Sequence, residues 1–264
     1  MFRNYIFKII IFFKKKFIGF KQIHENEIKK KKYNLAYQNK DLIELILLKN
    51  KEFRKKKNNF ILEDKNLFSG MFRIKKKIKV LDLGGGGGHT FLTFKKNYPF
   101  KNILWYNYET PALVKLFKKH LKIENKLTFT HNLEEIPEKI DLLYSNGSLH
   151  YIQDQPDLIN KILKKKINYI YIKRTFFNQK NFKTISAMQQ SLLSENGPGS
   201  IQKKLFNDRI IKYPLYILSK EKFEKLIKKK FFLIYKKKDD RDFIIINGIK
   251  YFSFVYLFKS KIIS

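Results

Sequence analysis

Five consecutive glycines, Gly84 to Gly88, carry the strongest chemical signal in the sequence. An apolar run that ends at Asp82 precedes them, and a segment able to start a helix follows at Thr90. Glycine permits positive φ angles and close approach of the backbone, and a helix start offers N–H groups without helical partners. This order predicts a strand, a turn and a helix that bind a nucleotide-like ligand, and it disfavours a flexible linker.

The spacing of the glycines indicates which ligand to expect. A dinucleotide fingerprint, G-x-G-x-x-G, would place its third glycine at His89 or Thr90, so it fits poorly. The pattern D-x-G-x-G-x-G does fit from position 82, and it resembles the first motif of class I S-adenosylmethionine (SAM) methyltransferases. The resemblance implies SAM as the cofactor, bound by Asp82, Gly84, Gly85, Gly86 and Gly88.

Glu109 tests that interpretation. It ends an apolar run from Ile103 and stands 21 positions after Gly88. A doubly wound fold places such an acid about 20 residues after the glycine loop, where it accepts hydrogen bonds from ribose hydroxyls. The alternative is a surface glutamate at a strand end. With the glycine loop upstream, we expect Glu109 to bind the cofactor.

Further candidates stand where later strands should end, because ligands of open α/β sheets bind beyond the carboxyl ends of the strands. After the third strand, His131 and Asn132 are expected near adenine, with a plain loop as the equal alternative. Ser145 ends the fourth strand and is expected beside the cofactor, and Ser148 is expected beside the substrate.

His150 and Arg174 could act on the acceptor. The imidazole of His150 could serve as a general base because it ordinarily titrates near neutrality, although a packed histidine at a helix start is the favoured alternative. Arg174 ends the fifth strand and could hold an anionic substrate group, with a structural ion pair as its even alternative.

Alternating strands and helices must position these residues. Strands are expected at 78–83, 103–109, 127–130, 140–144, 167–173 and 231–237, with helices at 111–121, 155–164 and 219–230. Asn247-Gly248, between apolar runs, predicts a hairpin. We therefore predict a doubly wound, mostly parallel, seven-stranded Rossmann-like α/β methyltransferase sheet over 71–264, interrupted by an insertion near 176–216. Residues 1–70, with a helix at 41–49, form a basic N-terminal appendage.

Composition excludes several chemistries. The 264 residues include no cysteine, which rules out disulfides, thiolate metal sites and cytosine C5 methylation. No acid cluster suggests a catalytic metal. The sequence Ser145-Asn146-Gly147-Ser148 stands where amino methylation of bases usually has an Asn/Asp-Pro-Pro-aromatic block. The net charge is +34, but only six of the 57 basic residues are arginine and the lysine runs are scattered, so a solvated surface is favoured over nucleic-acid binding.

The segment 1–16 is apolar and basic. It is shorter than the about 20 apolar residues of a membrane-spanning helix, and no small-residue cleavage site follows it. It could lie on an anionic membrane surface through Lys14 to Lys16, or it could dock on the catalytic domain, which is slightly favoured. A cytoplasmic protein is expected, with peripheral contact at the inner membrane face as the further possibility.

A narrower resemblance covers about 70–260. The blocks Val80 to Gly85 and Trp105-x-x-x-Glu109-x-Pro111 resemble the V-L-D-F-G-G and W-x-V-V-E-x-P blocks of an uncharacterised bacterial family of proposed SAM methyltransferases, often encoded in surface-polysaccharide gene clusters. Residues 145–151 resemble its S-S-x-L-Q-Y, with Asn146 and His150 departing from the pattern. Further similarities are Arg174-Thr175, a glutamine at Gln189 or Gln190, and the block Tyr213 to Ser219. The family implies no established substrate.

These features favour O-methylation of a small-molecule or glycan-linked acceptor. The insertion stands where a lid or acceptor wall would form, and polar and aromatic groups suit a small polar ligand. Its candidate substrate residues are Gln189, Tyr213 and Tyr216. The alternatives are RNA methylation, prompted by the charge, and a catalytically degenerate domain that acts as a binding scaffold.

Overall fold

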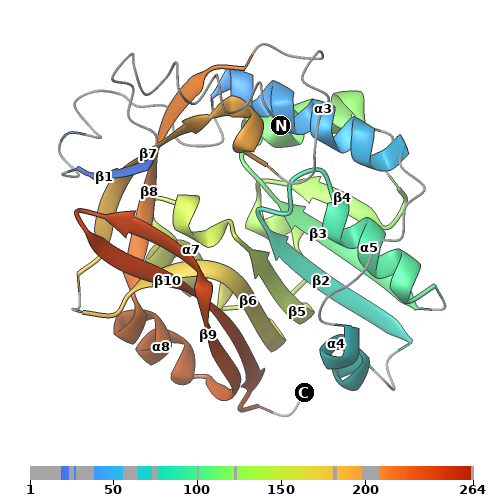
Figure 1. Cartoon of the computed structure of the whole chain (residues 1–264). Helices are drawn as coiled ribbons and strands as arrows, with labels where there is room; N and C mark the ends of the chain where they lie inside the picture. Colours follow the sequence, from blue (N-terminus) through green and yellow to red (C-terminus); the bar gives the residue numbers. More distant parts are fainter. Residues whose placement is uncertain are drawn as a thin grey trace.

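The computed structural model describes residues 19–23, 27, 39–55, 65–72, 76–99, 101–121, 124–180, 183–197 and 208–262. The apolar segment 1–16 lies outside these residues, so its expected membrane or docking role stays a prediction. Within the described part, ten strands join one mixed sheet (Figure 1). No helix among the described residues is long and apolar enough to cross a membrane.

Five parallel strands form the centre of the sheet, in the order β4-β3-β2-β5-β6. They are β2 (Lys77–Leu83), β3 (Asn102–Tyr108), β4 (Leu127–Thr130), β5 (Lys139–Asn146) and β6 (Lys166–Asn178). Beyond β6 lie β10 (Ile249–Ser260), antiparallel to β6, and β9 (Phe231–Ile246), antiparallel to β10. The predicted α/β sheet with mostly parallel strands is therefore confirmed.

The strand count is the correction, because the sheet has ten strands and not seven. The insertion after the fifth parallel strand supplies β7 (Ile185–Leu192) and β8 (Ile210–Ser219), an antiparallel pair. β8 pairs with only the last two residues of β6, Phe177 and Asn178. β1 (Gly19–Gln22) pairs with β7 as the outermost strand. The insertion thus extends the sheet beyond β6 through the antiparallel pair β7 and β8.

Helices cover both faces of the parallel strands. Ile78 and Val80 of β2 face one core with α3 (Lys40–Lys55), α4 (Lys65–Phe72), α5 (His89–Asn97) and α6 (Pro111–His120). Leu81 and Leu83 face the other core, with α7 (Gln155–Ile162) and α8 (Lys220–Lys228). Because side chains alternate across a strand, β2 serves both cores with apolar residues on each of its faces, while Lys77 and Lys79 stand near its start. The sheet centre is therefore fully enclosed.

The segments assigned to the appendage join this body. α3 begins one residue before the helix expected at 41–49 and continues to Lys55, and its buried leucines and isoleucines belong to the first core. α3 contacts α6 and the short 3₁₀ turn Leu193–Glu195 that follows β7. The boundary at residue 70 stays a prediction.

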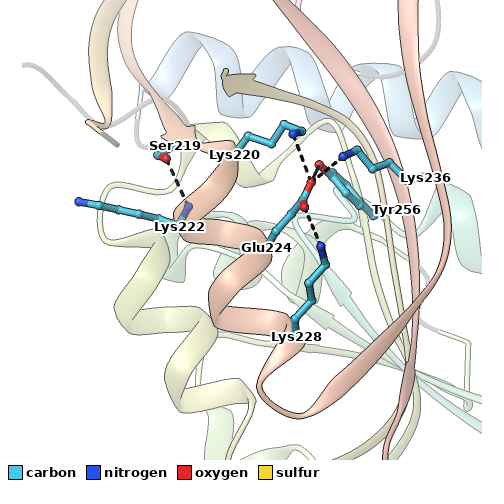
Figure 2. A network of polar contacts seen from close by, with 7 residues as sticks. All are labelled: Ser219, Lys220, Lys222, Glu224, Lys228, Lys236 and Tyr256. Carbon is cyan, nitrogen blue, oxygen red and sulfur yellow. Dashed lines mark hydrogen bonds and ion pairs between the residues drawn. The ribbon is translucent and has the colours of Figure 1, made fainter. Parts of the chain in front are cut away.

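The C-terminal hairpin departs from its expected length. Strand β9 runs unbroken through the charged stretch 236–242, where an end at 237 was expected. The hairpin turn itself is confirmed, since Asn247 and Gly248 both have positive φ angles. Figure 2 shows how α8 is fastened to the hairpin: the carboxylate of Glu224 contacts Lys220, Lys228 and Lys236 and accepts a 2.7 Å hydrogen bond from Tyr256.

Candidate functional site

The glycine loop connects β2 to α5, and each of its five positions favours glycine on steric grounds. Gly84, Gly86 and Gly88 have φ angles of 70°, 57° and 84°, the left-handed region that disfavours other residues. The two between them have no room for a side chain. A Cβ on Gly85 would lie 2.2 Å from Oδ2 of Asp82, and one on Gly87 would lie 2.1 Å from Cγ of Asn50 on α3.

Strand β3 braces this loop through alternate residues. The indole of Trp105 donates to Oδ2 of Asp82 at 3.1 Å. The side chain of Asn107 accepts from Gly85 N at 3.0 Å and donates to Gly86 O at 2.5 Å. Glu109, just after the strand, accepts from Gly86 N at 2.7 Å through Oε1. Residues two apart share one face of a strand, so the spacing itself aims all three at the loop.

The two acids at the loop are buried. Asp82 is 1% exposed and Glu109 is 8% exposed. Burial raises the pKa of Asp82 to about 8, against the opposing hydrogen bond from Trp105. Burial likewise raises the pKa of Glu109 to about 7, against hydrogen bonds from the backbone of Gly86 and Thr110. Asp82 is thus largely protonated at neutral pH, whereas Glu109 titrates near pH 7.

A cavity of about 640 Å³ opens beside the loop, beyond the ends of β2, β3 and β4. Gly84, Glu109, His131, Asn132 and Ser148 line it, so the structure brings five of the predicted site residues together. Its remaining charged groups are mostly acidic, although the chain as a whole is strongly basic. Glu134, Asp154 and Asp157 line it with a single lysine, Lys161, which contacts Asp157 at 2.7 Å.

A smaller cavity of about 250 Å³ lies on the other side of Gly84, Glu109 and Ser148. Asp82, Gly85 and Gly86 line it from the loop, and Arg174, Gln189 and Tyr213 line it from β6, β7 and β8. The two cavities share Tyr151, whose hydroxyl donates to Oε1 of Gln189 at 3.0 Å. A ligand in the larger cavity would therefore adjoin one in the smaller.

One wall of the smaller cavity is held by a buried lysine on α3. Lys49 is 2% exposed, and its ammonium donates to the carbonyl oxygens of Ser194, Asn196 and Gly197 at 3.0, 2.6 and 3.3 Å. Burial lowers the pKa of Lys49, and Asp208 partly offsets that effect. The insertion thus does supply a wall, fastened to the N-terminal helix rather than left as a free lid.

Two polar side chains lining the smaller cavity have buried atoms without hydrogen-bond partners. They are both ring nitrogens of His89 and Oδ1 of Asn146. Burial, with Arg54 and Lys49 nearby, lowers the pKa of His89 to about 4, so its ring is neutral at pH 7. Buried polar groups are rarely left unpaired in proteins, so these atoms are available to a ligand or to an ordered water in the cavity.

Four predicted residues do not line either cavity. Gly88 packs against Leu127, and Ser145 is buried with its hydroxyl 3.0 Å from that of Ser148. Tyr216 is 3% exposed within β8. His150 is also 3% exposed, between the rings of Tyr151 and Phe176.

The geometry therefore does not support His150 as a general base. Burial, with a further contribution from the charge of Arg174, lowers the pKa of His150 to about 3. Such a ring is a weak proton acceptor at neutral pH. Its packed position corresponds to the alternative that the sequence favoured.

The comparisons with known proteins are distant. No family model and no curated protein matches the chain. Similar solved structures include a SAM-dependent methyltransferase from Clostridium acetobutylicum, at 14% identity and a TM-score of 0.45, covering 80% of this chain and 95% of that one. The N-methyltransferase NodS from Bradyrhizobium japonicum, in complex with S-adenosyl-L-homocysteine, has 11% identity and a TM-score of 0.46, covering 83% and 97%. The CcbJ methyltransferase from Streptomyces caelestis has 9% identity and a TM-score of 0.47, covering 81% and 98%.

Sequence reasoning missed three residues of the site. Asn107 could have been found, since it stands midway between Trp105 and Glu109 on the same face of a predicted strand. His89 was noted only as a mismatch to the dinucleotide pattern, and Lys49 stood among many lysines. Nothing in the local sequence distinguishes Lys49, because its partners lie 145–148 positions away.

No group of three or more His, Asp or Glu side chains in the described ranges could hold a metal ion.

Proposed function

We propose that this chain is a SAM-dependent methyltransferase, in which the cofactor fills the larger cavity and extends along Gly84 to Gly86 into the adjoining part of the smaller one, and a small polar acceptor occupies the rest of the smaller cavity. The observation that carries the proposal is the acidic lining of the larger cavity, beside a glycine loop, in a chain of net charge +34. SAM is a nucleoside with a cationic sulfonium and no phosphate. The opposite lining would be expected for a phosphate-bearing ligand such as NAD or ATP.

The backbone of the loop independently disfavours a phosphate. Phosphate-binding glycine loops aim their N–H groups at the ligand. Here Gly85 N and Gly86 N donate to the side chains of Asn107 and Glu109. Gly84 N donates to Tyr108 O at 2.9 Å, and Gly88 N donates to Gly85 O at 3.2 Å. These four amides are already engaged within the protein, which suits a cofactor that meets the loop by close approach.

The residues present fit a nucleoside with an amino-acid tail. A Cβ on Gly86 would meet no atom within 4 Å, so the loop leaves open space where a cofactor could approach the backbone. Glu109 would accept hydrogen bonds from the ribose hydroxyls, and Asn132 would bond the adenine edge. When bound, SAM would supply an electrophilic methyl group: the acceptor hydroxyl oxygen bonds to this carbon as the C–S bond breaks, sulfur keeps the electron pair, and the hydroxyl proton passes to solvent water.

The chain supplies polar side chains to bind the acceptor, and the paired strands β7 and β8 hold these side chains in place. Gln189 on β7 and Tyr213 on β8 line the smaller cavity. Such groups suit O-methylation of a small-molecule or glycan-linked acceptor. The same proposal places the protein in the cytoplasm, where SAM is available, with peripheral membrane contact left to residues 1–16.

Calorimetry tests the cofactor. We expect SAM and S-adenosylhomocysteine to bind, and NAD and ATP not to bind. Tight NAD binding without a SAM response would contradict the proposal.

Methyl labelling of a fractionated cell extract tests the reaction. Label from SAM in a carbohydrate, lipid-linked or small-molecule fraction supports the proposed acceptor class. Nuclease-sensitive label would instead establish RNA methylation. SAM binding without turnover on any fraction, together with strongly salt-dependent binding to polyanions, would establish a scaffold.

A further inference from the structure

Arg174 occupies an irregular position in β6. In the pairing with β10, Thr175 lies opposite Phe254 and Ile172 lies opposite Tyr256. Lys173 and Arg174 therefore share the single partner position of Val255, which defines a β-bulge. Arg174 also has a φ angle of 50°, one of only two positive values among the described residues other than glycine. A bulge adds a residue and re-aims a side chain.

The surrounding structure does not explain this conformation by packing. The side chain of Arg174 is 68% exposed, and its one ion pair, with Asp242, spans 3.9 Å. A left-handed arginine carries a conformational penalty, and such outliers gather where a binding site fixes them. Arg174 lines the smaller cavity and is the only lysine or arginine among the described residues that do so. The bulge therefore presents one cation to the acceptor side.

Asn146 adds a hydrogen-bond acceptor close to that cation. A Cβ on the following residue, Gly147, would lie 3.7 Å from Cβ of Arg174, so the turn after β5 adjoins the bulge. The amide of Gly147 donates to Lys173 O at 3.0 Å and fixes this arrangement. Oδ1 of Asn146 is buried without a hydrogen-bond partner and lines the same cavity. A hydroxyl of a bound molecule could satisfy it.

We propose that the methyl acceptor is an acidic molecule, whose anionic group binds Arg174 and whose hydroxyl donates to Asn146. This inference rests on the proposed function and narrows it, because a neutral sugar would leave the guanidinium with only its 3.9 Å contact to Asp242, whereas an anionic group would add charge-assisted hydrogen bonds. Asp82, Glu109 and Glu195 also line the cavity, and none of these acids would attract an anion, so Arg174 marks the one position on its wall where an anionic group would bind. Carboxylate and phosphate both match the guanidinium fork.

The test compares a neutral probe with two acidic ones. Binding of D-glucose, D-glucuronate and D-glucose 6-phosphate to the protein saturated with S-adenosylhomocysteine is measured by ligand-observed NMR titration. We expect at least one acidic probe to bind tenfold or more tighter than glucose, and the better one identifies carboxylate or phosphate. Equal affinities, or no binding by either acid at millimolar concentration, would overturn the inference.

Variants locate the effect. Arg174→Asn removes the charge and tolerates the left-handed backbone, so it should fold normally and lose the preference for acids. Arg241→Asn is the matched control, since Arg241 is 94% exposed on β9 and lines neither cavity. Arg174→Gly should lose the preference as well and keep or raise Tm, because glycine relieves the strained φ. A preference that survives Arg174→Asn contradicts the assignment.

The same titrations separate the two proposals. If S-adenosylhomocysteine does not bind in the calorimetry above, the proposed function fails. If it binds with its affinity unchanged in Arg174→Asn, and the acid preference is absent in the wild type, only the present inference fails.

Discussion

The variant Gly86→Ala distinguishes the role of Gly86 in folding of the glycine loop from its role in cofactor binding. The left-handed φ of 57° penalises an alanine by about 1–2 kcal/mol. The reduced freedom of the unfolded chain offsets about 0.5–1 kcal/mol of this. No atom lies within 4 Å of the new Cβ, so no clash adds to the balance. The free energy of unfolding should therefore fall by at most about 1.5 kcal/mol, and Tm by at most about 6 °C.

Cofactor binding should change far more than stability. The new methyl group projects into the open space that a ligand would fill, so we expect SAM affinity to fall at least tenfold, which corresponds to about 1.4 kcal/mol. Calorimetry measures the affinity, and denaturant unfolding measures the stability. Gly86→Val should remove binding altogether.

Two other glycines provide the controls. Gly248→Ala has the same kind of strain, with φ 76° and nothing within 4 Å of its Cβ, but it lies in the β9–β10 turn. It should lose similar stability and bind SAM normally. Gly87→Ala should behave oppositely and destabilise the fold by roughly 1–3 kcal/mol, because its Cβ overlaps Asn50. The reasoning is refuted if Gly86→Ala binds SAM as tightly as Gly248→Ala does.

Three further predictions concern ionisable groups. The pKa of Glu109 is raised to about 7, and its carboxylate should bind SAM better than its neutral form, so SAM affinity should rise between pH 6 and 8. The free energy of unfolding of the ligand-free protein should fall as pH rises from about 4.5 to 7, because the unfolded chain ionises this group first. Glu109→Gln should flatten the pH profile of SAM affinity, measured by calorimetry, and that of unfolding. Lys49→Met should raise hydrogen exchange in the 193–197 wall and the acceptor KM with little change in SAM affinity, whereas Lys51→Met, on the exposed side of α3, should change neither. Against the opposing effect of burial, hydrogen bonds from Lys228, Lys236 and Tyr256 hold the pKa of Glu224 at about 2, so its stabilisation is complete above about pH 4.5 and lost as pH falls through 2. Glu224→Gln should lower the free energy of unfolding by about 1–3 kcal/mol at pH 7 but not near pH 2, and the exposed Glu221→Gln should not; equal effects of the two would contradict the network in Figure 2.

Local patterns in the sequence were sufficient to predict the parallel strands of the sheet. The strand expected at 127–130 has those bounds in the structure, and the one expected at 78–83 begins one residue earlier. The agreement has a physical basis, because buried parallel strands must be apolar on both faces and their helices amphipathic. The glycine spacing likewise reported backbone geometry directly, since positions 84, 86 and 88 are the ones with positive φ.

The acceptor side could not be derived in the same way, because its contacts join distant parts of the chain. Tyr216 is expected on the acceptor wall, but residues 213 and 216 lie on opposite faces of β8, so Tyr213 lines the cavity and Tyr216 does not, although both are buried. The bulge that re-aims Arg174 depends on the register between β6 and β10, which no local pattern encodes. Burial of Lys49 depends on a loop at 194–197.

These long connections imply an order of assembly during synthesis. The strands β2 to β6 are joined by short crossovers, so they can pair soon after residue 178 is made. By contrast, Gly19 pairs with Gln190, Asp41 contacts Arg209, and Lys49 bonds the 194–197 loop. α3 can pack early against α5 and α6 in the first core, but its contacts with the insertion must wait for partners made about 150 residues later, and closing so long a loop slows this last step. We expect the cofactor half to form first and the acceptor half to be completed as the insertion docks on α3 and β1.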